Sequence, residues 1–300
     1  MGDILVGTCS WTDPALVRSG WYPRGRRDAA GRLRYYAERF PVVEVDSTYY
    51  GLPGERNSRL WAERTPDRFT FDVKAFSMLT GHPTRPTALP ADLRDRPRDA
   101  AVLDEVWARF TAGIEPLREA GRLGSVLFQF PPWLRPGEHA GDLLAHTARR
   151  TRGWPVAVEF RHPDWWREGN AEATRALLAA HGMAAVAVDM NQSVPSAVPP
   201  VTPVTAPALS VVRFHGRSAS WGQGSKEDRF RYAYDEDELR AWLPRLHALA
   251  ERADEVHVLF NNCCADAAVR AAETMTRLLD RTAAPSDDRD ADRGGTEHRP

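Results

Sequence analysis

The sequence has little of several features that would assign a protein to a class at once. Only three cysteines occur in 300 residues, Cys9, Cys263 and Cys264. Their odd number and their lack of zinc-type spacing argue against a disulfide framework and favour reduced thiols. No run of 18 apolar residues occurs, and the opening MGDILVGTCSW has no basic segment of the signal-peptide kind. We therefore expect a cytoplasmic protein with no membrane association.

An excess of charge of one sign is also missing. Forty basic residues face 41 acidic ones, which gives a formal net charge of −1 and an isoelectric point near 6.8. A chain this close to neutrality has no global field that would attract nucleic acid, so we do not expect a nucleic-acid partner. Any anion site must therefore be local. Lysine is scarce, since Lys74 and Lys226 are the only two.

Eight short β-rich segments alternate with helical patterns along the chain. The predicted strands are residues 4–7, 42–46, 69–74, 125–130, 156–160, 184–189, 209–214 and 255–260. Helical patterns cover residues 31–40, 101–121, 171–182 and 236–253. A repeated strand–helix order predicts parallel pairing. Eight such units in this length fit a closed (β/α)8 barrel of the TIM type, and no G-x-G-x-x-G follows the first strand to indicate a dinucleotide fold.

One barrel domain accounts for residues 1–281 in this interpretation. Residues 282–300 are charged and have no apolar periodicity, so we expect a disordered C-terminal tail. Residues 191–208 are rich in proline and valine, which predicts an extended connection in place of a helix. The proline-rich segment 81–101 predicts a long connection after the third strand, which either covers the barrel mouth, with His82 near the site, or is an ordinary surface loop.

Apolar and polar residues alternate within most of the predicted strands. In 42–46, Val43 and Val45 share one face, while Glu44 and Asp46 share the other. Because helices cover the outside of a (β/α)8 barrel, we expect the polar face of each strand to point inward. The same reasoning assigns Ala187 and Asp189 of the sixth strand to the interior.

The inward polar residues lie near the carboxyl ends of their strands, where TIM-barrel enzymes build their active sites. The predicted catalytic residues are Glu44, Glu159, Asp189 and His215. The predicted substrate-binding residues are Trp11, Asp46, Tyr49, Lys74, Gln129, Arg161, His162, Arg213, Asn261 and Asn262. A structural ion-pair ring, in which arginines only neutralise Glu44 and Glu159, is the alternative. His257, deeper in the eighth strand, is interpreted as a packed core histidine.

Two features point to an anionic ligand. Arginines at a barrel mouth suit bidentate capture of a carboxylate or a phosphate. After the seventh strand comes a loop with Gly216, Gly222 and Gly224 before Lys226. Many TIM barrels hold phosphate at this place. We therefore predict a small anionic molecule as the ligand.

Several blocks resemble one known family. They are VEVDSTYYGLP (43–53), TPDRFTFDVKA (65–75), LFQFPP (127–132), AVEFRHPDWW (157–166), VRFHG (212–216) and FNN (260–262). These blocks are similar to those of the YecE-like proteins, known as domain of unknown function 72, over about residues 4–280. The resemblance implies a TIM-type barrel but no established reaction. The chain departs from the family's usual GTSGW opening, with GTCSW at residues 7–11.

These observations lead to three hypotheses on function. The first is a metal-independent acid/base enzyme of hydrolase or lyase type, without a cofactor, acting on a small anionic substrate that is phosphorylated or contains a sugar. Glu159 and Asp189 would be its acid and base, with His215 as a proton shuttle. The second is a metal-dependent phosphoesterase or sugar isomerase that uses Glu159, Asp189, His162 and His215. The third is a non-catalytic binder of an anionic ligand or nucleic acid. The oligomeric state stays open.

Overall fold

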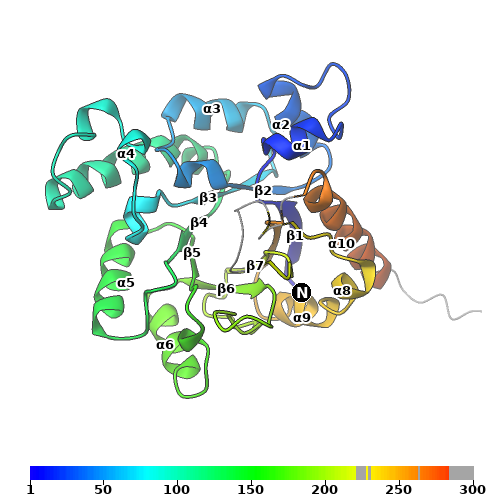
Figure 1. Cartoon of the computed structure of the whole chain (residues 1–300). Helices are drawn as coiled ribbons and strands as arrows, with labels where there is room; N and C mark the ends of the chain where they lie inside the picture. The colour runs from blue at the N-terminus through cyan, green and yellow to red at the C-terminus, as the bar shows by residue number, and fades with distance from the viewer. Residues whose placement is uncertain (221–227, 229–230, 263, 284–300) are drawn as a thin grey trace, which may run out of the picture.

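Eight parallel strands close into one barrel in the computed structural model, which describes residues 1–220, 228, 231–262 and 264–283. Each strand pairs with the next along the chain, and β8 pairs with β1 (Figure 1). The strands are β1 Asp3–Thr8, β2 Val42–Val45, β3 Thr70–Lys74, β4 Leu123–Gln129, β5 Val156–Glu159, β6 Ala184–Asp189, β7 Leu209–Phe214 and β8 Glu255–Phe260. The predicted (β/α)8 barrel is confirmed, and every predicted strand is present.

Helices surround the barrel (Figure 1). They are α1 Pro14–Arg18, α2 Ala29–Ala37, α3 Glu55–Glu63, α4 Ala100–Glu119, α5 Glu138–Arg150, α6 Ala171–Ala180, α8 Glu236–Arg240, α9 Leu243–Ala250 and α10 Ala267–Ala283. The pattern at 236–253 predicted one helix, but the structure has two, α8 and α9. Pro244 explains the break, because proline has no N–H and its ring would clash with the carbonyl group four residues earlier.

Short 3₁₀ turns occupy several of the loops that follow the strands. They are η1 Asp46–Tyr49, η2 Ser77–Thr80, η3 Pro86–Ala88, η4 Ala91–Leu93 and η5 Pro163–Trp165. Residues 190–208 connect β6 to β7 without a helix, as their proline content predicts. The connection from β3 to α4 contains three of the 3₁₀ turns, which agrees with a long proline-rich loop there.

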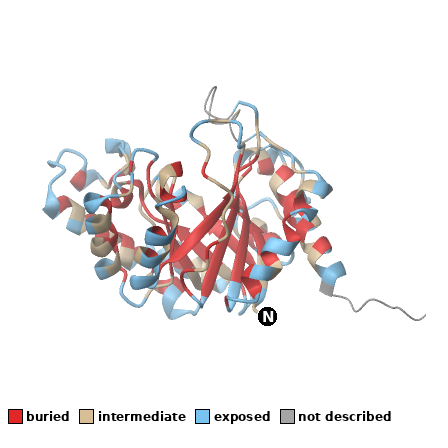
Figure 2. Cartoon of the chain, turned by 90° about the horizontal axis from the view of Figure 1, so that it is seen from below, coloured by how far each residue is buried: buried red, intermediate tan, exposed pale blue. Residues whose placement is uncertain are grey.

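The core lies between the barrel and the helices. Figure 2 shows buried strands surrounded by helices whose outer faces are exposed. Helix α4 illustrates the pattern, because Val102, Val106, Phe110 and Ile114 recur four residues apart and are all buried. The side chain of Asp99 caps the start of α4 by accepting a hydrogen bond from the backbone N–H of Val102 (2.9 Å).

The inward face of β6 differs from the prediction. Val188 pairs with Arg213, whose side chain crosses the barrel interior, whereas Asp189 pairs with Phe214. Phe214 packs against Trp242 outside the barrel (ring centroids 5.1 Å apart), so Asp189 also points outward. The predicted inward direction of Asp189 is therefore wrong. In AAVAVD both alternating sets are apolar apart from Asp189 itself, so the alternation did not show which face points inward. Outside the barrel, Trp242 supplies an indole N–H that satisfies the carboxylate.

Within the described part of the chain, no helix has the length and apolar character to cross a bilayer. Helix α10 continues to Ala283, two residues past the predicted end of the barrel domain. The remainder of the predicted tail, residues 284–300, lies outside the described residues. The domain boundary at residue 281 stays a prediction.

Candidate functional site

A cavity of about 780 Å³ opens at the carboxyl ends of the strands. Its wall comes from residues that end or follow β1, β2, β3, β4, β5, β6 and β8. Seven of the predicted binding residues line it: Asp46, Tyr49, Lys74, Gln129, Arg161, Asn261 and Asn262. The structure therefore brings these side chains from separate strands together around one cavity, and their role in substrate binding stays a prediction.

An ion pair between Lys74 and Asp46 lies in the cavity wall. Lys74 ends β3 and Asp46 follows β2, and the Nζ atom is 2.7 Å from Oδ1 of Asp46. The same Nζ lies 4.8 Å from the ring centroid of Tyr49. The hydroxyl of Thr48 donates to the carbonyl oxygens of Val45 and Lys74, which ties the two strand ends together. The acid and the base are thus held on neighbouring strands, facing a space large enough for a ligand.

Glu159 lies behind the cavity wall and organises it. Its fully buried Oε1 accepts hydrogen bonds from Nε2 of Gln129 (2.8 Å) and Nη1 of Arg161 (3.0 Å). Burial by itself would raise the pKa of Glu159, but Arg213, His215 and Arg161 together hold that pKa well below its usual range. The carboxylate is therefore ionised and fixes two side chains that reach the cavity.

Arg213 bridges two buried carboxylates inside the barrel. It donates through Nε and Nη2 to Glu44 (2.8 and 2.7 Å) and through Nη1 to Glu159 (2.5 Å). Burial raises the pKa of Glu44 to about 7, although Arg213 and Lys74 act in the opposite direction. Glu44, Arg213 and Glu159 are not among the residues that line the cavity. Their arrangement matches the structural ion-pair alternative, and it puts Glu44 and Arg213 out of direct contact with a ligand in the cavity.

His215 belongs to the same buried cluster. Its Nε2 lies 3.0 Å from Oε1 of Glu159 and its Nδ1 lies 3.0 Å from the side-chain amide of Asn261. Burial lowers the pKa of His215 to about 4, so the ring is neutral at neutral pH. A neutral tautomer in which Nε2–H donates to Glu159 and Nδ1 accepts from Asn261 satisfies these two neighbours. Nη1 of Arg161 also lies 3.0 Å from Nε2, and it donates to the same Glu159 oxygen. His215 thus connects Glu159 to an amide that lines the cavity.

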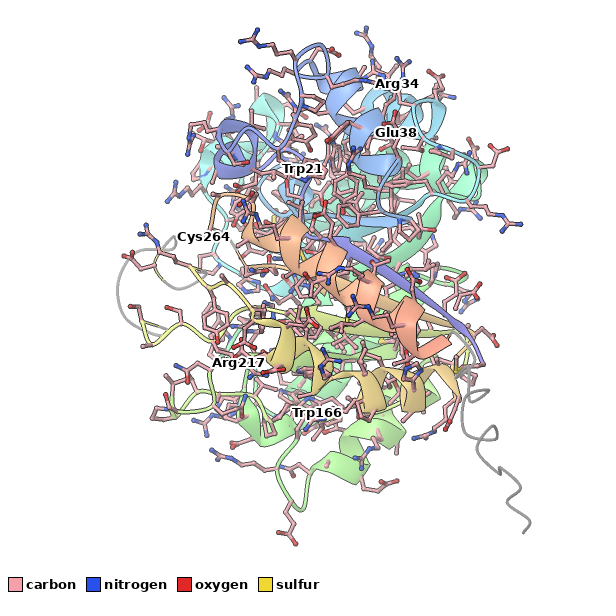
Figure 3. The ribbon with its side chains drawn as sticks, turned by 90° about the vertical axis from the view of Figure 1, so that its right-hand side faces the viewer. Trp21, Arg34, Glu38, Trp166, Arg217 and Cys264 are labelled. Atoms are coloured by element: carbon pink, nitrogen blue, oxygen red, sulfur yellow. The ribbon has the colours of Figure 1, made fainter. Side chains whose placement is uncertain are left out.

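Three predicted site residues lie elsewhere. Asp189 accepts hydrogen bonds from Arg217 (2.9 and 2.6 Å), from the Tyr234 hydroxyl (2.7 Å) and from the indole N–H of Trp242 (2.8 Å). In Figure 3, Arg217 is labelled on the left-hand side of the molecule, as is Cys264, which precedes α10. Asp189 is therefore satisfied outside the barrel and cannot be the acid or base of the cavity.

His162 and Trp11 also lie away from the cavity. Nδ1 of His162 accepts from the backbone N–H of Asp164 (3.1 Å), at the start of the turn η5. The Trp11 ring packs edge-on against Trp61 and Phe71, with centroids 5.6 and 6.2 Å away. Both residues were predicted to bind substrate because they are next to site residues in the sequence. Neighbouring residues in a loop can face opposite sides, so their position in the sequence did not show which side they face.

The four residues of the proposed metal set are not brought together, because Asp189 and His162 have separate partners. Among the described residues, no three His, Cys, Asp or Glu side chains gather in a way that would hold a metal ion. The prediction of an anionic ligand also used the loop with Gly222, Gly224 and Lys226. These three residues lie outside the described residues.

The cavity also contains residues that were not in the predicted set. Ser10, Thr12 and Asp13 line it from the loop after β1. Asp13 caps α1 by accepting hydrogen bonds from two backbone N–H groups. The sequence signal that could have indicated this cap is the pair Asp13-Pro14, because proline is common at the first position of a helix. His82 lines the cavity too, as expected. Burial, with Lys74 and Arg161 nearby, lowers the pKa of His82 to about 4, which makes its ring neutral.

A second buried cluster lies at the opposite end of the barrel. His257 of β8 contacts Asp72 of β3 (2.8 Å) and Glu255 (3.1 Å), and Ser125 donates to Asp72 (2.7 Å). Gly124 permits this arrangement, because a Cβ there would lie 2.9 Å from both Asp72 and His257. Burial would lower the pKa of His257, but Asp72 and Glu255 outweigh it and raise that pKa to about 9. The interpretation of His257 as a core histidine is confirmed.

Comparisons with known proteins agree with the barrel. The chain is 31% identical over 283 residues to the UPF0759 protein YunF of Bacillus subtilis, covering 92% of this chain and 95% of YunF. It is 30% identical over 172 residues to the UPF0759 protein YecE of Escherichia coli, covering 57% of this chain and 53% of YecE.

Two solved structures and one family model complete the comparison. A DUF72 family protein of Thermotoga maritima superposes with a TM-score of 0.76 at 29% identity, covering 93% of this chain and 99% of that one. A DUF72 family protein of Enterococcus faecalis gives a TM-score of 0.78 at 24% identity, with 93% and 98% covered. The model described as "Protein of unknown function DUF72" matches residues 5–293. The chain therefore belongs to the DUF72 family.

Proposed function

We propose that the cavity binds a small anionic, sugar-containing or phosphorylated substrate and that the protein acts on it by metal-independent acid/base catalysis of hydrolase or lyase type. The observation that carries this proposal is the pairing of Lys74 with Asp46 in one open cavity that Arg161 also lines. A fixed ammonium and a fixed guanidinium suit an anionic group, and hydroxyl and amide side chains around them suit a hydroxylated ligand.

The cations of the cavity support an anion as the ligand. Lys74 and Arg161 line the cavity, and Arg213 lies beneath it. Asp13, Asp46 and Glu159 balance these three positive charges, and Glu44, whose pKa is about 7, adds a fourth negative charge only as pH rises through neutrality. Binding of an anion therefore depends on direct contact with Lys74 and Arg161, and not on a net positive charge of the site.

Asp46 and Lys74 take the acid/base roles that the sequence had suggested for Glu159 and Asp189. In a hydrolysis, the Asp46 carboxylate accepts a proton from the attacking water, and the Lys74 ammonium gives a proton to the leaving oxygen. In an elimination, Asp46 accepts the proton from carbon instead. Glu159 acts at a distance in either case, since it positions Gln129 and Arg161.

A binding experiment tests the first half of the proposal. Calorimetry would measure the affinity of the protein for ribose 5-phosphate, gluconate and sulfate, with ribose as the uncharged comparison. We expect the three anions to bind and ribose to bind at least about tenfold more weakly, which corresponds to about 1.4 kcal/mol. Arg161→Met and Lys74→Met should each remove the preference for the anion.

The matched control is Arg118→Met, which removes an exposed arginine that pairs with Glu115 on α4, away from the cavity. It should bind the anions as the unaltered protein does. Equal binding of ribose and ribose 5-phosphate, or unchanged binding in Arg161→Met, would contradict the anion site.

Turnover tests the second half. The protein would be incubated with a panel of phosphorylated sugars and sugar acids, and released phosphate and dehydrated products would be measured by mass spectrometry. We expect turnover of at least one compound that binds, and its loss in Asp46→Asn with binding retained. Binding without any turnover across the panel would instead favour a non-catalytic binder of an anionic ligand.

A further inference from the structure

Trp133 is the exposed tryptophan among the residues that the structure describes. Its exposed fraction is 59%, whereas every other described tryptophan is buried or partly buried. It lies in the loop after β4, directly after Pro132, which lines the cavity. A large aromatic side chain left in solvent at the rim of a polar cavity is typical of a binding surface.

A row of rings connects Trp133 to the cation of the cavity. The Nζ atom of Lys74 lies 4.8 Å from the Tyr49 ring centroid. The Tyr49 ring is 5.4 Å from the His82 ring, and the His82 ring is 5.7 Å from the Trp133 ring. Tyr49 and His82 both line the cavity, so Trp133 continues its aromatic wall outward. His82 fits this row as a neutral ring, because burial and two nearby cations lower its pKa to about 4.

The loop that carries Trp133 is held in place. The backbone N–H of Leu134 donates to the carbonyl oxygen of Pro131 (3.0 Å), which closes a turn around Trp133. The buried indole N–H of Trp165 donates to the carbonyl oxygen of Leu134 (2.9 Å). Two prolines, a turn and this anchor limit the freedom of the backbone. A ring that stacks on Trp133 would therefore meet a surface that needs little ordering.

The surroundings of Trp133 distinguish between a sugar and a flat base. Its neighbours in the chain are Pro131, Pro132 and Leu134, which have no side-chain hydrogen-bonding groups. The ring beside it, that of His82, already uses Nδ1 in a hydrogen bond with the Thr80 hydroxyl (2.8 Å). A sugar ring needs partners for its hydroxyl groups, whereas the face of a nucleobase stacks on an aromatic ring without them. The hydroxyl and amide side chains, which suit the hydroxyl groups of a ribose, line the cavity itself.

We propose that Trp133 forms an outer subsite that stacks on the nucleobase of a nucleotide whose phosphate lies at Lys74 and Arg161. This inference rests on the proposed anion site and narrows its substrate class to a nucleoside monophosphate or a close relative. The base lies at the rim, the ribose lies among the polar side chains, and the phosphate lies at the two cations.

The test compares a nucleotide with its own fragment. Calorimetry would measure the affinities for adenosine 5′-monophosphate and for ribose 5-phosphate, which differ by the base. Stacking of one base on an aromatic side chain should make the nucleotide bind about 5- to 150-fold tighter. Trp133→Ala should bring this ratio to about one without changing the affinity for ribose 5-phosphate, and Trp133→Phe should retain most of the ratio.

Each failure has a separate meaning. If neither compound binds, the anion site itself is refuted. If ribose 5-phosphate binds but the nucleotide binds no tighter, or if the ratio survives in Trp133→Ala, the outer subsite is refuted and the anion site stands. If a disaccharide phosphate gains affinity through Trp133 while the nucleotide does not, the occupant is a sugar and the nucleobase assignment is wrong. Lys74→Met should weaken both compounds by the same factor.

Discussion

The barrel contains two buried charge clusters, and they differ in where their hydrogen bonds lead. The upper cluster joins Glu44, Arg213, Glu159 and His215, and it continues to Gln129, Arg161 and Asn261, which line the cavity. The lower cluster joins the buried Asp72, Ser125 and His257 to the exposed Glu255, and none of these four lines the cavity at the mouth. Both clusters bury ionised groups across the barrel. A buried charge is therefore a poor marker of function by itself, and the better marker is a hydrogen-bond path that reaches open space.

The strongest test of the upper cluster is Arg213→Met. This change leaves Glu44 and Glu159 buried without their shared cation, so the free energy of unfolding should fall by about 3–5 kcal/mol or more. Urea denaturation at pH 7 would measure it. Arg118→Met, which breaks an exposed pair, should change the same quantity by less than about 1 kcal/mol. Similar losses in the two variants would mean that the upper cluster does not stabilise the barrel.

The lower cluster should make stability depend on pH without affecting binding. Folding raises the pKa of His257 from 6.5 to about 9, so the folded protein binds more protons than the unfolded chain between these values. The stabilisation is fully present below pH 6.5 and is lost as pH rises through about 9, by about 3 kcal/mol in all. Urea denaturation across this range would record the slope.

His257→Gln should remove the part of this slope that belongs to the imidazole, because Gln has no group that titrates there. Its affinity for sulfate should equal that of the unaltered protein. A slope that is unchanged in His257→Gln would assign the pH dependence to another group.

The upper cluster should instead make binding depend on pH. As pH rises through about 7, Glu44 loses its proton and adds a negative charge beneath the cavity. Sulfate, whose charge is constant in this range, should bind about tenfold more weakly at pH 8 than at pH 6. Glu44→Gln should bind sulfate with the same affinity at both pH values. Calorimetry on both proteins would check it, and a pH dependence that persists in Glu44→Gln would exclude Glu44 as its source.

The smallest effect should come from replacing His162, whose neighbour Arg161 faces different surroundings. Arg161 lines the cavity, whereas His162 bonds to the backbone of η5. His162→Ala should change sulfate affinity by less than about twofold and the free energy of unfolding by about 1 kcal/mol or less. Arg161→Met should lose binding. A large loss of affinity in His162→Ala would show that the predicted role of His162 was right after all.

The sequence predicted the site well where alternation was sharp. In FTFDVK, each apolar residue is followed by a polar one, and Asp72 and Lys74 both point inward as expected. In AAVAVD the two faces differ little in polarity, and the inward assignment of Asp189 failed. The prediction also placed Glu44, Asp46, Lys74 and Arg213 together in one site. The structure separates them by height, so Asp46 and Lys74 face the cavity while Glu44 and Arg213 lie below it.

By itself, the sequence determined that eight parallel strands form and that several of them carry charge toward a common interior, because these features depend on local periodicity and strand–helix order. The tertiary structure alone decided which charges neutralise each other and which face a ligand. Arg213 and Glu44 are 169 residues apart in the chain, and Asp72 and His257 are 185 apart. Whether two such residues pair depends on their positions along the axis of the closed barrel, and no local sequence pattern gives that position.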